Sequence, residues 1–226
     1  MTQRLRIQLG GQAPAAGSAH FEDFEVNLPS GATLLDALEY IRTGVAPDLM
    51  YRHSCHHGSC GTCAVRVDGK EVLACLTALD SLAGGIPVIE PLRALKLEKD
   101  LAVDPGALFR SLPKNTSHLR ESEVEHYIRF EDCIECGSCV SACPVTARSW
   151  DASTGKVEGF LGPAALAAVH RESLNSPERA EEMRTVAERP DGVAACEKHF
   201  DCSRVCPRMV YPGKHIEMLR REFART

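Results

Sequence analysis

Residues 55–75 read CHHGSCGTCAVRVDGKEVLAC and hold four of the eleven cysteines of this 226-residue chain. The first three cysteines are spaced C-x4-C-x2-C, and Cys75 follows further along. Gly58 and Gly61 lie inside the loop, where a missing side chain lets the backbone curl and its N–H groups approach the cysteine sulfurs. The pattern therefore predicts a loop that wraps several thiolates around one small metal centre.

This spacing is typical of plant-type [2Fe–2S] ferredoxins, so we predict a cluster on four cysteine ligands. The predicted ligands are Cys55, Cys60, Cys63 and Cys75. A zinc knuckle is the alternative, but zinc sites favour two C-x2-C pairs, and this loop has one pair and a longer arm. The neighbouring His56 and His57 are possible Rieske-like ligands, although a complete set of four cysteines favours an exposed role for both.

The flanking sequence favours a β-grasp fold around this loop. Apolar residues alternate in the manner of strands, and Asp36 follows Thr33 by three residues, as in a helix capping box. We expect strands over Leu5–Leu9 and Phe24–Leu28, a helix from Thr33, and a hairpin of Ala64–Val67 that returns through Asp68-Gly69 toward Val72 and Cys75.

A second cysteine run, at residues 133–143, reads C-x2-C-x2-C-x3-C and is followed by proline. In bacterial two-cluster ferredoxins the fourth cysteine of such a run binds the other cluster, and the missing ligand comes from the second run. Cys206 also precedes a proline. We therefore predict a [4Fe–4S] cluster on Cys133, Cys136, Cys139 and Cys206.

The remaining cysteines are Cys143, Cys196 and Cys202, and they predict a [3Fe–4S] cluster. A complete ferredoxin run has a further cysteine where this chain has His199. Two alternatives stay open: His199 is a fourth ligand that holds a [4Fe–4S] cluster, or it packs beside the cluster and tunes it. With three ligands at this centre, the three clusters use all eleven cysteines and leave none for a disulfide.

Composition and patterning limit the remaining possibilities. A net charge of −5 and a pI near 6.0 argue against nucleic acid as the main partner. The longest apolar stretch, Phe160 to Val169, is too short to span a membrane, and the first residues alternate like a strand rather than a signal peptide. By itself, such a chain is expected to be soluble and cytosolic.

We predict an α+β protein of two domains. Residues 1–104 form the plant-type ferredoxin domain, and residues 105–226 form a mostly helical domain with the other two clusters. Predicted helices of the second domain are Ala164–Leu174 after Gly162-Pro163, Glu178–Glu188 with Ser176 as N-cap and Pro177 at the first position, and Gly213–Ala224.

In this order, the motifs resemble the iron–sulfur subunits of the succinate dehydrogenase and fumarate reductase family, over nearly the whole chain. Residues 51–75 are similar to the family's R-x-S-C-x-x-G-x-C-G-S-C stretch, and the C-x5-C-x3-C-P ending, which lacks one ligand, is the most diagnostic part. The stretch FLGPAALAAVHR at residues 160–171 is close to the fumarate reductase branch. Residues 87–104 resemble the family's connection between domains.

The resemblance implies a subunit that bears no catalytic residues and passes single electrons along its three clusters. The clusters connect the FAD of a flavoprotein subunit, which acts on succinate or fumarate, to a quinone at membrane anchor subunits. These anchor subunits can carry haem b. The [2Fe–2S] cluster lies nearest the flavin and the [3Fe–4S] cluster nearest the quinone. The complex is expected at the cytoplasmic face of the inner membrane, with this chain bound peripherally.

The chain also departs from the family. Ubiquinone-linked members place tryptophans where this chain has Ala147 and Arg148, and its only tryptophan is Trp150. A menaquinone-type acceptor is therefore favoured. The family's basic residue near the quinone matches Arg220, so the candidate quinone residues are Arg148, Trp150 and Arg220, although a solvent-exposed face also explains Arg220.

Two other functions fit the same motifs. One is the same relay in a complex that acts on another dicarboxylate, or that delivers electrons to a soluble thiol or heterodisulfide protein. The other is a free ferredoxin-like carrier, against which the length and the three-cluster sequence argue.

Overall fold

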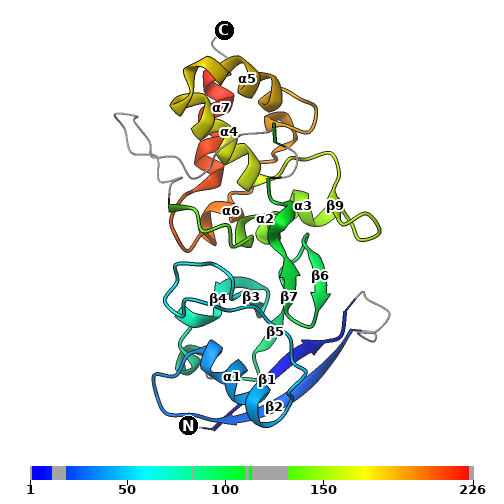
Figure 1. Cartoon of the computed structure of the whole chain (residues 1–226), viewed down its shortest axis with the longest axis vertical. Coiled ribbons are helices and arrows are strands. Elements are labelled where there is room, and N and C mark those ends of the chain that lie inside the picture. Colours follow the sequence, from blue (N-terminus) through cyan, green and yellow to red (C-terminus); the bar gives the residue numbers. More distant parts are fainter. Residues whose placement is uncertain (1, 12–18, 83, 110–111, 114–131, 224–226) are drawn as a thin grey trace. The chain divides into compact units, whose positions relative to one another are not determined.

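The computed structural model describes residues 2–11, 19–82, 84–109, 112–113 and 132–223. The chain divides into two compact units (Figure 1). The N-terminal unit comprises Met1–Leu92 and Lys96–Asp104, and the C-terminal unit comprises Arg93–Leu95 and Pro105–Thr226. The N-terminal unit carries the main sheet and the C-terminal unit is mostly helical, as the sequence predicts.

The N-terminal unit is built on a mixed five-stranded sheet with the strand order β2-β1-β5-β3-β4. β1 pairs antiparallel with β2 and parallel with β5, where Arg6 faces Val88. Leu5 and Ile7 alternate with exposed residues along β1 and are fully buried, so one face of the sheet forms the core. The strands are β1 (Thr2–Leu9), β2 (His20–Asn27), β3 (Ala64–Val67), β4 (Lys70–Leu73) and β5 (Val88–Glu90).

Helix α1 (Leu34–Gly44) begins at the predicted position. The Thr33 side chain accepts the Asp36 N–H, and the Asp36 carboxylate accepts the Thr33 N–H at 2.8 Å, which completes the capping box. Its buried residues Leu34, Leu38 and Ile41 recur at helical spacing and form its core-facing side.

Two features of this unit differ from expectation. Val88–Glu90 belongs to the sheet as β5, between β1 and β3, and is not part of a connection between domains. A separate two-stranded sheet, β6 (Lys96–Lys99) with β7 (Ala102–Asp104), was not expected. Its tight turn is held by the buried Asp100, whose carboxylate accepts the Gly10 N–H at 2.7 Å and the Met50 N–H at 2.8 Å.

In the C-terminal unit, short helices carry the cysteines and longer helices form the core. The elements are α2 (Ser138–Ala142), α3 (Pro144–Arg148), the hairpin of β8 (Trp150–Asp151) with β9 (Lys156–Val157), α4 (Pro163–Asn175), α5 (Ala180–Ala187), α6 (Asp201–Arg204) and α7 (Pro212–Phe223). Single 3-10 turns lie at Ala74–Leu76, Leu79–Leu82, Pro105–Ala107, Pro177–Arg179 and Val193–Ala195. Among the described residues, no helix is both long and apolar enough to cross a membrane.

Helices α4 and α7 match their predicted bounds to within one residue, except that Ala224 lies outside the described residues. The predicted helix over Glu178–Glu188 is partly wrong. Pro177–Arg179 forms a 3-10 turn, and α5 begins at Ala180. Ser176 does not cap it, because its hydroxyl donates instead to the buried Glu172 carboxylate at 3.4 Å.

Helix α4 is buried around most of its circumference and carries polar side chains into the core. His170 on α4 and His215 on α7 are 1% and 2% exposed, and their Nδ1 atoms are 2.9 Å apart. Burial lowers the pKa of His170 to about 4 and that of His215 to about 3, with Lys214 adding to both shifts. Both rings are therefore neutral at pH 7, and one Nδ1–H donates to the other Nδ1.

This pair predicts a loss of stability in mild acid. The unfolded chain protonates both imidazoles below pH 6.5 while the folded chain does not, so the free energy of unfolding falls as the pH drops. Between pH 7 and pH 5.5 the two imidazoles together remove about 2 kcal/mol. Hydrogen exchange of the most protected amides of α4 and α7 measures the change.

The matched variant is H170L/H215L, which replaces both hydrogen-bonding partners with apolar side chains. Over the same pH range it is expected to lose about 2 kcal/mol less than the wild type. Equal pH dependence in the two proteins would show that the imidazoles are not the source.

Candidate metal centres

The loop of the N-terminal unit directs backbone N–H groups at cysteine sulfur. Cys55 Sγ accepts N–H groups from His57 at 3.5 Å, Ser59 at 3.2 Å and Cys60 at 3.3 Å. Cys60 Sγ accepts the Cys55 N–H at 3.5 Å and lies 3.1 Å from Thr62 Oγ1. Donors converging in this way stabilise negative charge on sulfur.

Left-handed backbone makes this convergence possible. The φ angles are +77° at Gly58 and +70° at Gly61, which confirms that these positions need glycine. His56 has a φ of +62°, a backbone conformation that residues with a Cβ rarely adopt. The loop therefore curls around Cys55, and this curl directs its backbone N–H groups at the sulfur.

Two cysteines of this loop differ in electrostatics. Backbone hydrogen bonds, that of His57 first, lower the pKa of Cys55 to about 6, so it is a thiolate at neutral pH. Burial raises the pKa of Cys63 to about 12. A thiolate at Cys63 therefore needs a cation beside it, which the iron of a cluster supplies, and the donor set fits a [2Fe–2S] centre.

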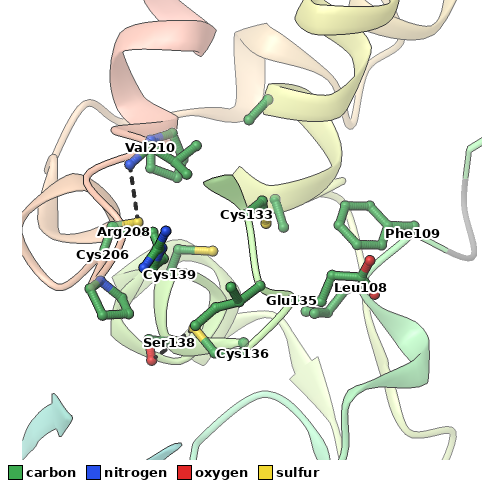
Figure 2. A pocket seen from close by; sticks show the side chains of 16 residues that line it. Leu108, Phe109, Cys133, Glu135, Cys136, Ser138, Cys139, Cys206, Arg208 and Val210 are labelled. Carbon is green, nitrogen blue, oxygen red and sulfur yellow. Dashed lines mark hydrogen bonds between the residues drawn. The ribbon is translucent and has the colours of Figure 1, made fainter. Parts of the chain in front are cut away.

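In the C-terminal unit, Cys206 meets the first three cysteines of the second run. Cys133, Cys136, Cys139 and Cys206 line one pocket, together with apolar side chains that include Leu108 (Figure 2). The Val210 N–H donates to Cys206 Sγ at 3.3 Å, and Cys136 Sγ lies 3.4 Å from Ser138 Oγ. This is the set that the sequence predicts as four-iron ligands.

Burial governs the chemistry of this pocket. It raises the pKa of Cys133 to about 12 and also raises those of Cys136 and Cys139, and charge on the neighbouring cysteines raises the pKa values further. Four thiolates so close together in an apolar pocket require a polycationic core between them, so the residues fit a [4Fe–4S] cluster.

Cys143, Cys196 and Cys202 line a second pocket of this unit, with His199 and Phe160 at its wall. Burial raises the pKa of Cys202 to about 11. The structure thus brings together the three cysteines predicted for the third centre, and a metal centre with thiolate ligands fits them.

The open question of His199 concerns this second pocket. Its Nε2 lies 2.9 Å from Glu197 Oε2, and Glu197 also accepts a hydrogen bond from Arg148 at 2.5 Å. The His199 side chain is 40% exposed. In this structure the imidazole Nε2 therefore faces a carboxylate at the rim.

The candidate quinone residues occupy three different places. Arg148 is exposed and paired with Glu197. Arg220 donates to the Val193 carbonyl at 2.5 Å and the Cys196 carbonyl at 3.2 Å, so it holds the backbone that leads into Cys196. Trp150 lines a separate cavity of about 360 Å³.

Sequence reasoning missed the residues that support the sulfurs. Val210 donates its N–H to cysteine sulfur from outside the cysteine motifs, whereas Ser138 contacts Cys136 Sγ from within the second run, where Glu135 adopts a left-handed φ of +53°. Since any residue can supply a backbone N–H, no residue type marks such donors. Among the described residues, no group of three His, Cys, Asp or Glu side chains, the cysteine sets included, is arranged to hold a single metal ion.

Two protein-family models match the chain. One, described as a 2Fe-2S iron-sulfur cluster binding domain, matches residues 5–110. The other, described as a 4Fe-4S dicluster domain, matches residues 125–207. Together they confirm the predicted fold class, with a [2Fe–2S] ferredoxin domain followed by a domain of the four-iron type.

Several curated proteins are similar over almost their whole length. The fumarate reductase iron-sulfur subunit of Escherichia coli O157:H7 is 32% identical over 231 residues, which cover 95% of this chain and 91% of that protein. The Mycobacterium tuberculosis fumarate reductase iron-sulfur subunit is also 32% identical, covering 96% and 92%. The succinate dehydrogenase iron-sulfur subunit of Coxiella burnetii is 31% identical, covering 90% and 89%.

Among solved structures, a chain of the Mycobacterium smegmatis Sdh1 complex in the apo form has a similar fold. The TM-score is 0.78 at 22% identity, covering 99% of this chain and 96% of that one.

The loop geometry predicts the effect of adding a methyl group at Gly58. A Cβ at this position would be attached to left-handed backbone and would lie 2.7 Å from Leu76 Cδ1. We therefore expect G58A to uncurl the loop and to lower the content of two-iron cluster. The content is measured as EPR spin concentration after reduction. G31A is the control, because Gly31 has a similar φ of +85° and its Cβ meets nothing within 4 Å. G31A is expected to destabilise the unit by about 1 kcal/mol and to keep the cluster. Equal cluster loss in both variants would contradict the assignment.

Proposed function

The chain belongs to the iron–sulfur subunit family of succinate dehydrogenase and fumarate reductase, and on that premise we propose that it relays single electrons between the FAD of a flavoprotein subunit and a quinone at a membrane anchor. One observation carries the proposal: distant cysteines meet in the combinations that a three-cluster relay requires. Cys206 joins the first three cysteines of the second run, and Cys143 joins Cys196 and Cys202. Bound clusters would supply one-electron storage and transfer.

The proposed ligand sets follow these groupings. Residues 1–104 form one domain and bind a [2Fe–2S] cluster through Cys55, Cys60, Cys63 and Cys75. Residues 105–226 form the other domain and bind two further clusters. Their ligands are Cys133, Cys136, Cys139 and Cys206 for the [4Fe–4S] cluster, and Cys143, Cys196 and Cys202 for the [3Fe–4S] cluster.

The chain's own residues hold and tune these centres. Backbone N–H groups hydrogen-bond to Cys55 and Cys206, which favours the more negative, reduced state of a cluster. Apolar side chains such as Leu108 and Phe109 line the four-cysteine pocket and limit access of water to it. No acid–base chemistry on an organic substrate is assigned to this chain.

We assign the anchor-facing surface to exposed apolar residues of the C-terminal unit. Phe200, Met209 and Tyr211 are between 40% and 48% exposed, and each has a left-handed φ. Phe200 lines the pocket of Cys143, Cys196 and Cys202, and Met209 and Tyr211 follow Cys206. Large apolar side chains held out in strained conformations favour docking to another protein, here the membrane anchor, at the cytoplasmic face of the inner membrane.

A menaquinone-type acceptor suits this surface better than ubiquinone. Ala147 and Arg148 stand where ubiquinone-linked members carry tryptophans. Since Arg148 is paired with Glu197, this rim is charged where those members present aromatic rings. The same observation favours a second candidate, a soluble thiol or heterodisulfide acceptor, and purification of the complex without anchor subunits would support it.

EPR of the complex purified from its native host tests the relay. Succinate is expected to abolish an oxidised three-iron signal and to produce a reduced two-iron signal, because electrons enter through the flavoprotein. Dithionite then reduces the remaining centre. Reduction by dithionite alone would contradict succinate as the donor, and absence of a three-iron signal would contradict the cluster assignment.

A separate variant tests the role of His199. We expect H199V to keep the oxidised three-iron signal at wild-type intensity, because Nε2 of His199 faces Glu197 rather than a cysteine sulfur. H20V is the control, since His20 is an exposed residue of β2 outside the cysteine motifs. A three-iron signal that is absent from the wild type and appears in H199V would instead show that His199 is the fourth ligand of a four-iron cluster.

A further inference from the structure

A chain of polar side chains connects helix α1 to the loop that carries Cys55. It begins at Glu39, in the middle of the helix. The Glu39 carboxylate accepts hydrogen bonds from the Tyr51 hydroxyl and from Arg42 Nη2, the latter at 2.9 and 3.0 Å. His53 Nε2 lies 3.2 Å from the same carboxylate. Three residues therefore converge on one acid.

The charge on Glu39 strengthens these contacts. The hydrogen bond from Tyr51 and the neighbouring Arg42 lower the pKa of Glu39, so it is ionised at neutral pH. Hydrogen bonds to an ionised acceptor are stronger than those between neutral groups. Tyr51 is held further by stacking on His53, with ring centroids 5.3 Å apart.

The next contact passes from His53 to His56, with Nδ1 of His53 3.0 Å from Nε2 of His56. Nε2 of His53 is the donor toward the carboxylate, so in a neutral ring its Nδ1 is an acceptor. Nε2 of His56 must then carry the hydrogen that forms this bond. The carboxylate thus orders both rings, one after the other.

His56 is the residue at which the loop turns toward Cys55. Its φ of +62° is unfavourable for a residue with a Cβ, and a side-chain hydrogen bond helps to hold it there. The three N–H groups that converge on Cys55 Sγ, those of His57, Ser59 and Cys60, all follow this turn. Their direction depends on the backbone conformation of His56.

We propose that Glu39 is a positioning residue for the cluster loop: through His53 it holds His56 in its left-handed conformation, and so fixes the N–H···S hydrogen bonds at Cys55. This inference rests on the proposed function, in which Cys55 is a [2Fe–2S] ligand. It extends that function by assigning the tuning of the first centre to a helix residue outside the cysteine motif.

Three variants of the full chain in its complex separate this role from loss of surface charge. E39Q keeps the size of the side chain and removes its charge. E25Q removes one charge from an exposed residue of β2 in the same unit. E39Q/H56G adds a residue that adopts positive φ freely, so the loop no longer needs its side-chain support.

Two measurements report on the loop. Pulsed EPR of the reduced two-iron centre in D2O detects exchangeable protons coupled to it, which include the N–H···S protons. The second measurement is the rate of cluster loss, followed as the decay of the two-iron signal in the presence of a chelator. In E39Q we expect the strongest coupling to an exchangeable proton to weaken. The rate of cluster loss is expected to rise about fivefold or more. E25Q is expected to match the wild type, and E39Q/H56G to recover the coupling.

Each of the other outcomes would overturn one part of the proposal. Wild-type behaviour of E39Q would show that the network is only a surface ion pair. A response of E25Q equal to that of E39Q would assign the effect to charge alone. Failure of E39Q/H56G to recover the coupling would show that Glu39 does not act through His56. Absence of a two-iron signal from the wild type would instead overturn the proposed function.

Discussion

Burial of cysteine sulfur is the constraint on which the rest of this structure depends. It raises the pKa of Cys63 and Cys133 to about 12 and that of Cys202 to about 11. Thiolates at these positions are unfavourable unless a strongly cationic group lies among them. The protein surrounds such groups with apolar helices and strands, so folding and cluster binding are linked: a fold without iron keeps several buried thiols protonated and close together.

Left-handed backbone solves the geometric part of this problem. His56 and Gly58 in one unit, and Glu135 and Gly137 in the other, turn the chain tightly around cysteine sulfur. Glycine tolerates this conformation, whereas His56 and Glu135 need support from their surroundings. For His56, that support comes from side chains on a neighbouring helix, so an element without any cysteine helps to shape the first centre.

Much of this arrangement could be predicted from the sequence, because cysteine spacing reports directly on cluster geometry. The same pattern predicted that Cys206 leaves its own run and joins Cys133, as the pocket of Figure 2 shows. Strand β5 was missed because its few residues lie between Pro87 and Pro91 and look like a linker. Ser176 was misjudged because a buried carboxylate competes for its hydroxyl. The contacts of Glu39 depend on tertiary structure, so no local pattern indicates them.

A three-cluster relay requires that the cysteines divide into sets of four, four and three. Mössbauer spectroscopy of the ⁵⁷Fe-enriched wild-type complex, isolated without reductant, tests it most directly, because the technique detects every iron whatever its spin state. Two-iron, four-iron and three-iron components are expected together in one spectrum. A second four-iron component in place of the three-iron one would contradict it.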